Sequence, residues 1–381
     1  MQLLKNKILT KKPLKIAIIA DALDYQYAGI YYYTKEILKA LAKIDSFNEY
    51  FIVRSISEGD ISKNVKELII PQAKFPGAAP YRLFVQIPRI LAKQQVDIIV
   101  EPRHFGPFNL PKSIKRATFI HDLTPLHHPE WHQFTSRFLQ KLFLPSILKR
   151  TDHVLTNSEY TKQDIIRHFP VTKHKITCTL LAKEAFFKPQ KDLNRLKSLG
   201  IIKPYILHVG TIEPRKNLNL LIEAYNQLKQ DPNEQIELVL VGKQGWKSES
   251  VFKAIDNSPH KKDIKVLGYV ERKALIALYS SAEAFVYPSL FEGFGLPLVE
   301  AMACGCPIIS SNAACLPEIA DKAGLYFSPT SSKELLTQLQ TLRSAPSKKV
   351  SLKQAALQQA AKFSWEKTCL LYTSPSPRDR G

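Results

Sequence analysis

The sequence predicts an α/β protein built from two doubly wound parallel sheets in series. Its 381 residues are enough for two domains of ordinary size. Short apolar runs rich in isoleucine and valine alternate with stretches of helical periodicity along most of the chain. The composition is 45% hydrophobic and 23% charged, which excludes a disordered, collagen-like or coiled-coil protein. The two sheets are expected to face a cleft between the domains.

The first domain is expected over residues 1–187. Lys15–Ala20 is a short isoleucine-rich run, typical of a parallel strand buried on both faces. A loop is predicted at residues 21–29 and a helix at residues 30–43, where leucine and isoleucine recur at helical spacing. Further strands are predicted at residues 50–53, 96–100, 117–120, 153–156 and 176–181.

The second domain is expected over residues 188–368, and the polar stretch 188–203 is expected to connect the two. Its predicted strands are residues 205–209, 236–241, 264–267, 284–287 and 307–310. Its predicted helices are residues 218–229, 272–280, 298–303 and 333–342. Because this alternation repeats the first, both domains are predicted to be Rossmann-like, with ligands at the carboxyl ends of the strands.

The last residues are interpreted separately. Cys369–Asp379 matches one reading frame of a common sequencing-library adapter at all eleven positions. We therefore interpret residues 369–381 as adapter read-through and expect the natural C-terminus to be missing. Ser374-Pro-Ser-Pro377 is predicted to end any helix that reaches it, because proline lacks the N–H donor and clashes with the preceding turn.

The formal net charge is +20, and it is uneven along the chain. Residues 1–190 hold 29 Lys and Arg against 16 Asp and Glu, a net +13, and the remaining residues hold 25 against 18, a net +7. Such a balance favours anionic partners, which are phosphates, acidic lipids or nucleic acid. A solvated lysine-rich surface explains the same charge equally well.

No feature of the sequence predicts export or membrane insertion. No apolar run reaches the about 18–20 residues that a bilayer requires, and residues 1–13 lack the apolar stretch of a secretion signal. Five cysteines without paired spacing predict neither a disulfide framework nor a zinc site. A cytoplasmic location is therefore expected.

The segment Val209–Asn217 (VGTIEPRKN) lies between a predicted strand and a predicted helix. Gly210 allows close approach of the backbone, and Asn217 is expected to cap the helix. Arg215 and Lys216 place two cations beside a helix N-terminus, an arrangement that suits a diphosphate. A solvated Arg-Lys pair is the alternative, and this segment alone favours it, because such pairs are common.

The segment Pro288–Gly305 (PSLFEGFGLPLVEAMACG) joins the next strand to a helix bounded by a proline and a glycine. Gly293 and Gly295 predict a loop whose N–H groups can hold an anion. Glu300 is expected in the first helical turn, where the helix dipole keeps it ionised and a ribose diol can donate to it. Glu292 lies in the glycine loop itself, nearer any ligand.

These two segments resemble the signature of the retaining glycosyltransferases of family 4, the glycosyl transferases group 1, which have the GT-B fold. Glu292 and Glu300 match the family's Glu-x7-Glu motif, and residues 214–217 match its Pro-Arg-Lys-Asn segment. Other family motifs are resembled by Ala28–Tyr31, His121–Leu123, Thr156–Thr161 and Phe363–Thr368. The first of these departs from the family, which usually has a glycine where this chain has Ala28. The resemblance covers residues 15–368 and is nearest to mannosyltransferase-like enzymes of bacterial surface polysaccharide assembly.

The resemblance implies transfer of a hexose, with retention, from a nucleotide-diphosphate sugar to a glycan or lipid-linked acceptor. Arg215 and Lys216 would hold the donor diphosphate, and Glu292 would contact the transferred sugar and the phosphates. His121 would face the donor sugar from the first domain, and Glu300 would bind the nucleotide ribose. Further contacts are implied for Gly293, Phe294, Gly295 and Leu296 at the phosphates, for Gly268, Tyr269 and Val270 at the base, and for Gly29 beside the reaction centre.

Enzymes of this fold usually need no metal, so none is expected here as a cofactor. Four histidines nevertheless cluster in the first half of the chain: His121, His127, His128 and His132. His128 and His132 are four residues apart, as two metal ligands on one helix face would be. Pro129 lies between them and no third ligand is specified, which argues against a metal site.

The segment Phe134–Leu144, followed by Lys149 and Arg150, is basic and aromatic. Peripheral contact with an anionic membrane at its inner face would explain this pattern and would suit a lipid-linked acceptor. A helix that packs one face against its own domain explains it as well, and we favour that interpretation.

Two other functions fit parts of the pattern. A nucleotide-sugar epimerase has the same fold, and it would produce an epimer without an acceptor. A basic, non-catalytic protein that binds nucleic acid or a membrane surface would account for the charge. It also predicts stacked aromatic residues in a basic groove, a motif that the sequence lacks, so no nucleic-acid partner is expected.

Overall fold

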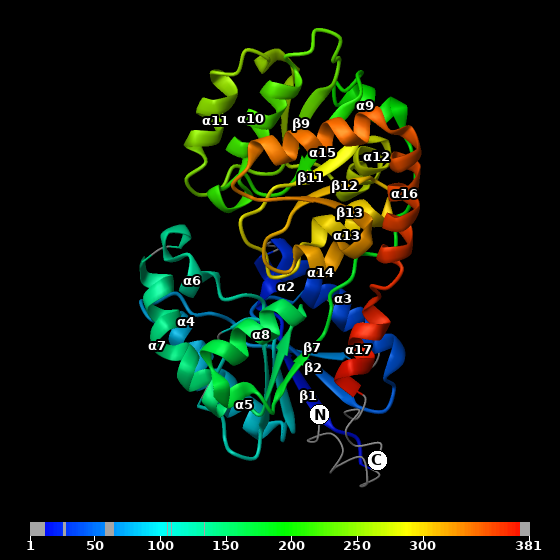
Figure 1. The fold of residues 1–381 in the computed structure, drawn as a ribbon. Helices are drawn as coiled ribbons and strands as arrows, with labels where there is room; N and C mark the ends of the chain where they lie inside the picture. Colours follow the sequence, from blue (N-terminus) through cyan, green and yellow to red (C-terminus); the bar gives the residue numbers. More distant parts are fainter. Residues whose placement is uncertain are drawn as a thin grey trace. The chain divides into compact units, whose positions relative to one another are not determined.

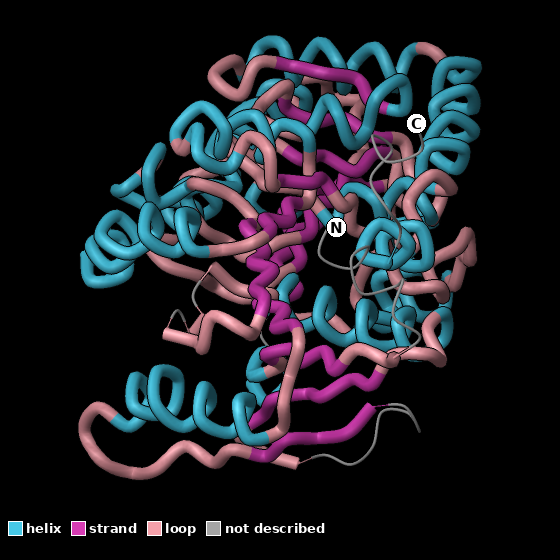
Figure 2. The backbone as a smooth tube through the Cα atoms, turned by 90° about the horizontal axis from the view of Figure 1, so that it is seen from below, coloured by secondary structure: helices cyan, strands magenta, loops and turns pink. Residues whose placement is uncertain are grey.

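The computed structural model describes residues 12–25, 28–57, 65–104, 106–107, 109–132 and 134–373. The chain forms two compact units, called unit 1 (Met1–Leu181 with Ser364–Gly381) and unit 2 (Ala182–Phe363). Each unit contains one parallel sheet, drawn as magenta strands in Figure 2, with helices packed around it (Figure 1). The predicted pair of doubly wound α/β domains is confirmed. The division falls before residue 188, where the second domain was expected to start, and the segment from Ser364 belongs to unit 1.

Unit 1 has a seven-stranded sheet in the order β3-β2-β1-β4-β5-β6-β7, with every neighbouring pair parallel. At its centre, Ile18 of β1 pairs with Ile52 of β2 on one side and Val100 of β4 on the other. The strand β3 was not predicted from the sequence, because Lys66 and Glu67 interrupt its apolar residues and it is only partly buried. The strands are β1 (Lys15–Ile19), β2 (Glu49–Arg54), β3 (Val65–Ile69), β4 (Ile98–Glu101), β5 (Lys115–Ile120), β6 (His153–Thr156) and β7 (Ile176–Cys178).

The loop predicted at residues 21–29 is wrong, because Asp21–Tyr25 form the short helix α2 and α3 begins at Ala28. Buried arginines hold α2: Arg82 donates from Nη1 and Nη2 to the two carboxylate oxygens of Asp21, at 2.7 and 2.8 Å. Such long-range pairs are invisible to local sequence patterns. The other helices of unit 1 are α3 (Ala28–Ile44), α4 (Ala78–Tyr81), α5 (Ile87–Lys93), α6 (Thr124–His127), α7 (Phe134–Arg150), α8 (Glu159–His168) and α17 (Trp365–Thr373).

Helix α17 packs against α3 within unit 1, where the two lie side by side in Figure 1. The ring of Trp365 lies 6.1 Å from that of Tyr33, and Cys369 is fully buried with its Sγ 3.7 Å from the main-chain O of Ile37. The helix therefore includes Cys369–Thr373 of the adapter-like segment and ends before the Ser-Pro-Ser-Pro sequence. The rest of that segment lies outside the described residues.

Unit 2 has a six-stranded parallel sheet in the order β10-β9-β8-β11-β12-β13. Its core packs the apolar strands against α10 and α15, with Leu221, Leu238, Val286 and Leu339 buried together. The edge strand β13 was missed, as β3 was. The strands are β8 (Tyr205–Val209), β9 (Glu237–Val241), β10 (Ile264–Gly268), β11 (Ala284–Tyr287), β12 (Ile308–Ser311) and β13 (Gly324–Phe327).

The helices of unit 2 follow the predicted alternation, with three longer additions that were not predicted from the sequence, besides the short helix α14 (Leu316–Ala320). One of them, α9 (Leu193–Ser198), lies in the stretch that was expected only to connect the domains, and α11 (Glu249–Asp256) and α16 (Pro346–Ala360) are the others. The predicted helices are α10 (Leu218–Leu228), α12 (Arg272–Ser281), α13 (Leu296–Ala303) and α15 (Ser332–Ser344), and a short helix α14 (Leu316–Ala320) follows β12. Within the described part of the chain, no helix is both long enough and apolar enough to cross a membrane.

Candidate functional site

The sheet of unit 2 has its topological switch point between β8 and β11. The two strands are neighbours at the centre of the sheet, yet β9 continues on one side and β12 on the other. In open α/β sheets the loops that leave the carboxyl ends of such strands form the ligand site. Here these are residues 210–217 and 288–295, the two loops that the sequence analysis singled out.

A compact ion cluster links the two loops. Arg215 donates from Nη1 to Glu292 Oε2 at 2.6 Å, and Lys216 donates from Nζ to Glu292 Oε1 at 2.5 Å. Both oxygens of one carboxylate are therefore held by two cations that come from the other loop. Arg215 also donates from Nη2 to Glu213 Oε1 at 2.8 Å, and its side chain is 26% exposed, whereas Lys216 and Glu292 are buried. The structure thus brings together the three unit 2 residues predicted to be catalytic.

The electrostatics of this cluster are dominated by its two cations. Burial by itself would raise the pKa of Glu292, but the charges of Arg215 and Lys216 outweigh it and lower the pKa to about 2. Burial and the charge of Arg215 lower the pKa of Lys216 from its ordinary value, while Glu292 opposes that shift. With Glu213, which accepts two hydrogen bonds from Arg215, the cluster holds two cations and two carboxylates.

Two aromatic residues below the cluster were not predicted. Tyr287, the last residue of β11, receives a hydrogen bond from Lys216 Nζ at 2.9 Å and donates to Glu292 Oε1 at 3.1 Å. His208 of β8 stacks on Tyr287, and burial lowers its pKa to about 4, so its ring is neutral at pH 7. The only sequence signal for either residue was its position at the end of a predicted strand.

The backbone of the first loop is set by glycine and by Asn217. A Cβ on Gly242 would lie 1.9 Å from the main-chain O of Gly210, so only glycine allows these two strand ends to meet. The expectation that Asn217 caps α10 is wrong: it lies in the left-handed region, and its side chain makes no cap hydrogen bond. Its Nδ2 donates instead to the main-chain O atoms of Pro329 and Pro288, at 2.8 and 3.2 Å. Asn217 therefore ties the first loop to the second.

The second loop begins α13. Gly295 has a φ of 95° and precedes the helix, and a Cβ there would lie 3.2 Å from Leu316. Phe294 is buried with its ring 5.8 Å from that of Phe363, so Phe294 contributes packing and only its main chain is available to a ligand. Gly293 precedes it in the same loop, and Leu296 is the first residue of α13. The helix ends as predicted, with Gly305 donating to Met302 O at 3.0 Å.

Glu300 is not in the first turn of α13, as was predicted, but is its fifth residue and is buried. Its Oε1 accepts a hydrogen bond from Arg272 Nη2 at 2.7 Å and its Oε2 accepts one from Tyr279 at 3.3 Å. Burial raises its pKa and Arg272 only partly offsets this, so the helix dipole does not decide its charge, contrary to the prediction. Arg272, which also pairs with Glu184, was missed because it comes from α12.

Replacing Glu300 by alanine should weaken nucleotide affinity by roughly tenfold or more, because a buried hydroxyl of the ligand would lose a charged acceptor. The Glu300→Gln variant keeps an acceptor oxygen, so its nucleotide affinity should lie between those of Glu300→Ala and the native chain. Isothermal titration calorimetry with nucleoside diphosphates measures the effect, and Glu223→Ala, on the exposed face of α10, is the matched control. Equal affinities for Glu300→Ala and the native chain would contradict the assigned role.

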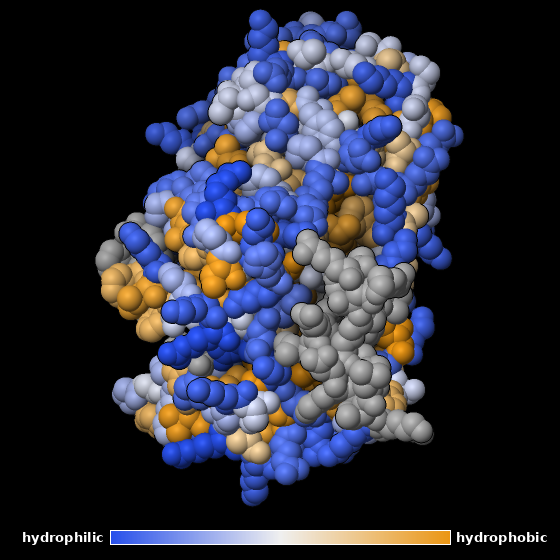
Figure 3. Space-filling model, turned by 60° about the horizontal axis from the view of Figure 1, so that its bottom comes forward, coloured by the Kyte–Doolittle hydropathy of each residue, from blue (hydrophilic) through white to orange (hydrophobic). Residues whose placement is uncertain are grey.

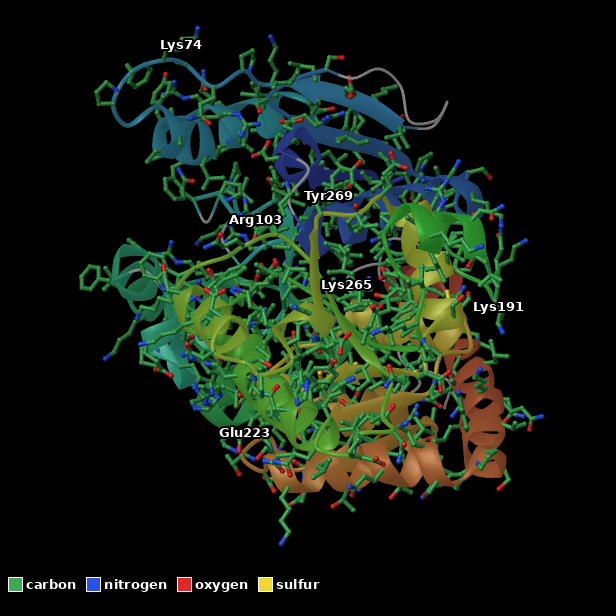
Figure 4. All side chains as sticks on the ribbon, turned by 90° about the horizontal axis from the view of Figure 1, so that it is seen from above. Lys74, Arg103, Lys191, Glu223, Lys265 and Tyr269 are labelled. Atoms are coloured by element: carbon green, nitrogen blue, oxygen red, sulfur yellow. The ribbon has the colours of Figure 1, made fainter. Side chains whose placement is uncertain are left out.

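The predicted base loop follows β10. Gly268 lies in the left-handed region with φ 66°, Tyr269 is 64% exposed, and Val270 is buried. The ammonium of Lys243 lies 5.2 Å from the centre of the Tyr269 ring. Figure 4 labels Tyr269 and Lys265, which come from the turn after β10 and from the strand itself. An exposed ring beside the switch-point loops offers a stacking surface for a base.

The remaining predicted residues belong to unit 1. His121 follows β5 directly, and its Nε2 lies 2.8 Å from the main-chain O of Pro102. Burial, and then the neighbouring His104, lower its pKa to about 4. The ring is therefore neutral at pH 7, with Nε2–H donating to Pro102 and Nδ1 left as an acceptor. Gly29 is an exposed residue in the first turn of α3 and not part of a loop, which corrects the expectation.

Of the four clustered histidines, the structure brings His127 together with other potential metal ligands. Within the described ranges, one set of potential ligands lies close together: His127 of α6 with Asp164 and His168 of α8. His127 Nε2 is 2.7 Å from Asp164 Oδ2, and His168 Nδ1 is 3.3 Å from Asp164 Oδ1. Hydrogen bonds to a buried carboxylate account for this arrangement. His128 and His132, whose spacing was considered and argued against as a metal site, do not belong to this group.

The basic aromatic segment forms α7, with one face against its own unit. Leu144 and Leu148 are buried in the core of unit 1, as the favoured interpretation predicted. Phe138 and Leu142 are 54% and 56% exposed and lie one turn apart, next to the exposed Lys141. On the face shown in Figure 3 the surface is mainly hydrophilic, with separate hydrophobic patches.

Comparison with known proteins gives concordant results for both halves of the chain. The family model described as Glycosyltransferase Family 4 matches residues 28–179, and the model described as Glycosyl transferases group 1 matches residues 196–359. The O-antigen chain mannosyltransferase B of Escherichia coli is 31% identical over 374 residues, which cover 93% of this chain and 97% of that protein.

Solved structures share the fold over nearly the whole chain. The sucrose-phosphate synthase of Thermosynechococcus elongatus has a TM-score of 0.76 at 19% identity, covering 94% of this chain and 97% of that one. HepE of Anabaena, solved in complex with UDP-glucose, has a TM-score of 0.72 at 16% identity, covering 93% and 97%. At these identities the likeness concerns the fold.

Proposed function

The chain belongs to glycosyltransferase family 4, the glycosyl transferases group 1, and we propose that it transfers a hexose, with retention, from a nucleotide-diphosphate sugar to a glycan or lipid-linked acceptor. It is a glycosyltransferase of surface polysaccharide synthesis and is similar over nearly its full length to an O-antigen mannosyltransferase. The proposal depends chiefly on the ion cluster of Arg215, Lys216 and Glu292 at the switch point of unit 2.

This cluster suits the leaving group of the reaction. Breaking the sugar–phosphate bond places negative charge on the diphosphate, and preorganised cations beside that oxygen are the largest expected aid. Glu292 holds Arg215 and Lys216 in position before the donor arrives, so little reorganisation is needed. Arg215 is the more accessible of the two and can fork onto phosphate oxygens, while Lys216 acts from below as a buried point charge.

We assign the binding of the other parts of the donor to neighbouring groups of unit 2. The main-chain N–H groups of residues 293–296 would contact the phosphates, and Glu300, positioned by Arg272, would accept hydrogen bonds from the ribose. Tyr269, between Gly268 and Val270, would stack on the base. In unit 1, the neutral ring of His121 keeps Nδ1 as an acceptor, which suits a sugar hydroxyl.

Retention follows if the acceptor attacks on the face that the diphosphate leaves, with the leaving phosphate taking the acceptor's proton. The site supports this route because Glu292, the carboxylate nearest the diphosphate site, has both oxygens bound to cations and is a weak base. The experiment is a screen of nucleotide sugars with lipid-linked glycan acceptors, followed by NMR of the product. An α-linked product from an α-linked donor is expected. An inverted product, or a free epimer formed without acceptor, would contradict the proposal.

We also propose that catalysis needs no metal, because Arg215 and Lys216 supply the charge that a cation would. Activity should stay within about twofold after treatment with a chelator and after addition of Mg²⁺, Mn²⁺ or Zn²⁺. Loss of activity with chelator that one metal restores would overturn this prediction and would direct attention to His127, Asp164 and His168.

The proposed location is the cytoplasm, with peripheral contact at the inner face of the membrane. The exposed pair Phe138 and Leu142 beside Lys141 supports this contact, since an apolar strip with adjacent cations suits an anionic lipid surface.

A further inference from the structure

A basic pocket of about 600 Å³ lies in unit 1, at the amino edge of the sheet. It is lined by residues that lead into β5 and by the residues between α7 and β6, and these include Lys112, Lys115, Arg116 and Arg150. His121 lies at the other end of β5, five residues beyond Arg116, which is about 16 Å along a strand. The pocket is therefore separate from the edge of the sheet where the reaction is proposed.

The cations of this pocket outnumber its carboxylates. Asp152 is the one acidic residue in the lining, and both its oxygens are engaged. Its Oδ1 lies 3.1 Å from Lys115 Nζ, and its Oδ2 accepts the main-chain N–H of Arg116 at 2.9 Å. The ammonium of Lys112 and the guanidinium of Arg150 remain exposed in the same lining.

Arg116 is the feature that a solvated basic surface does not explain. Its side chain is 5% exposed, and its Nε forms an ion pair with Glu101 Oε1 at 3.0 Å. Even so, Nε and the buried Nη2 of Arg116, and Oε1 of Glu101, have no hydrogen-bond partner among the described residues. Leaving a buried donor unpaired is costly, because the group has lost water and gained nothing. Burial lowers the pKa of Arg116, Glu101 and Asp152 oppose the shift, and the like charge of Arg150 adds to it. An anion in the pocket would supply the missing acceptor and relieve the repulsion.

We propose that this pocket binds a phosphate group, at a site distinct from the donor site of unit 2. A guanidinium group can bind two phosphate oxygens at once. Because Arg116 is paired with Glu101, Arg150 and Lys112 supply the two positive charges that match a phosphomonoester. Leu110 and Ile114 add apolar wall beside these cations, so the phosphate can belong to an organic ester. A free phosphate ester and the headgroup of an anionic lipid share this chemistry, and the test separates them.

The first arm uses the full chain and inorganic phosphate, with affinity measured by calorimetry. Arg150→Ala should weaken phosphate binding about tenfold or more, and Lys112→Ala should weaken it less. Both side chains are exposed, so neither change disturbs the core. Lys149→Ala, an exposed neighbour outside the pocket, is the matched control and should stay within about twofold of the native chain.

A second control separates this site from the donor site. Phosphate bound at the donor site would be lost in Arg215→Ala and kept in Arg150→Ala, whereas the proposal expects the reverse. The assignments of the two sites can therefore be refuted independently of each other. Arg116→Lys tests the buried group, and it should weaken phosphate binding while the thermal melt stays cooperative.

The second arm uses vesicles of phosphatidylglycerol and, as the neutral reference, phosphatidylcholine. If the natural source is a lipid headgroup, the native chain should bind phosphatidylglycerol only, Arg150→Ala should lose that binding, and phosphate should compete with it. If the source is a free ester, phosphate binds and vesicle binding is unaffected by Arg150→Ala. Absence of both phosphate and phosphatidylglycerol binding, or equal losses in Arg150→Ala and Lys149→Ala, overturns the proposal.

Discussion

Replacing Arg215 or Lys216 by alanine should lower the turnover number by roughly 10²–10³, the effect of removing one group that stabilises charge in a transition state. The two cations come from the loop after β8 and meet Glu292 from the loop after β11, where the leaving diphosphate is proposed to lie. Steady-state rates with the donor identified in the screen measure the loss. Arg215→Ala is the cleaner variant, because the Arg215 side chain is partly exposed and its removal leaves Lys216 on Glu292.

The matched control is Lys253→Ala, which removes an exposed lysine of α11 in the same unit. Its rate should equal that of the native chain. Circular dichroism and nucleotide titration of each variant establish that it is folded. If both Arg215→Ala and Lys216→Ala keep more than about a third of the native rate while folded, the diphosphate assignment is wrong.

Glu292→Gln should destabilise the protein by about 3 kcal/mol at pH 7, because it leaves the buried Lys216 ammonium and Arg215 without their shared carboxylate. The pKa of Glu292 is lowered from 4.5 to about 2 in the folded protein. Its stabilising effect is therefore fully present above pH 4.5 and is lost as the pH falls toward 2. The difference between native chain and variant should shrink over that same interval.

Denaturant unfolding of both proteins between pH 7 and pH 3 measures this convergence. Glu249→Gln, at an exposed position on α11, is the control and should change stability by less than about 0.5 kcal/mol at each pH. If the difference in free energy of unfolding between Glu292→Gln and the native chain stays constant with pH, the carboxylate charge does not stabilise the cluster. Because the folded pKa is low, the titration itself should leave activity unchanged near neutrality.

Most of the architecture could be predicted from the sequence. Buried parallel strands are short apolar runs, and helices between them show the 3.6-residue period, so the alternation of β8, α10, β9 and their counterparts was visible locally. The two functional loops could also be predicted, because polar and glycine residues directly after a predicted strand lie at the carboxyl edge of the sheet. The strands β3 and β13 were not predicted, because Lys66 and Glu67 interrupt the first and the second is a short run that begins at Gly324.

The two α/β sheets and the loops that carry Arg215, Lys216 and Glu292 could thus be predicted from local sequence patterns. The pairing of those side chains could not, because it depends on contacts between distant segments. Glu292 lies 76 residues from Lys216 along the chain and 2.5 Å from it in space, a contact set by the parallel pairing of β8 with β11. Glu300 is likewise bound to Arg272, and Asn217 ties two loops instead of capping a helix. Local sequence patterns determine helices and strands because backbone hydrogen bonds and burial repeat with a short period. Side-chain partners and pKa values, and buried groups without a hydrogen-bond partner such as Arg116, depend instead on which distant strands become neighbours.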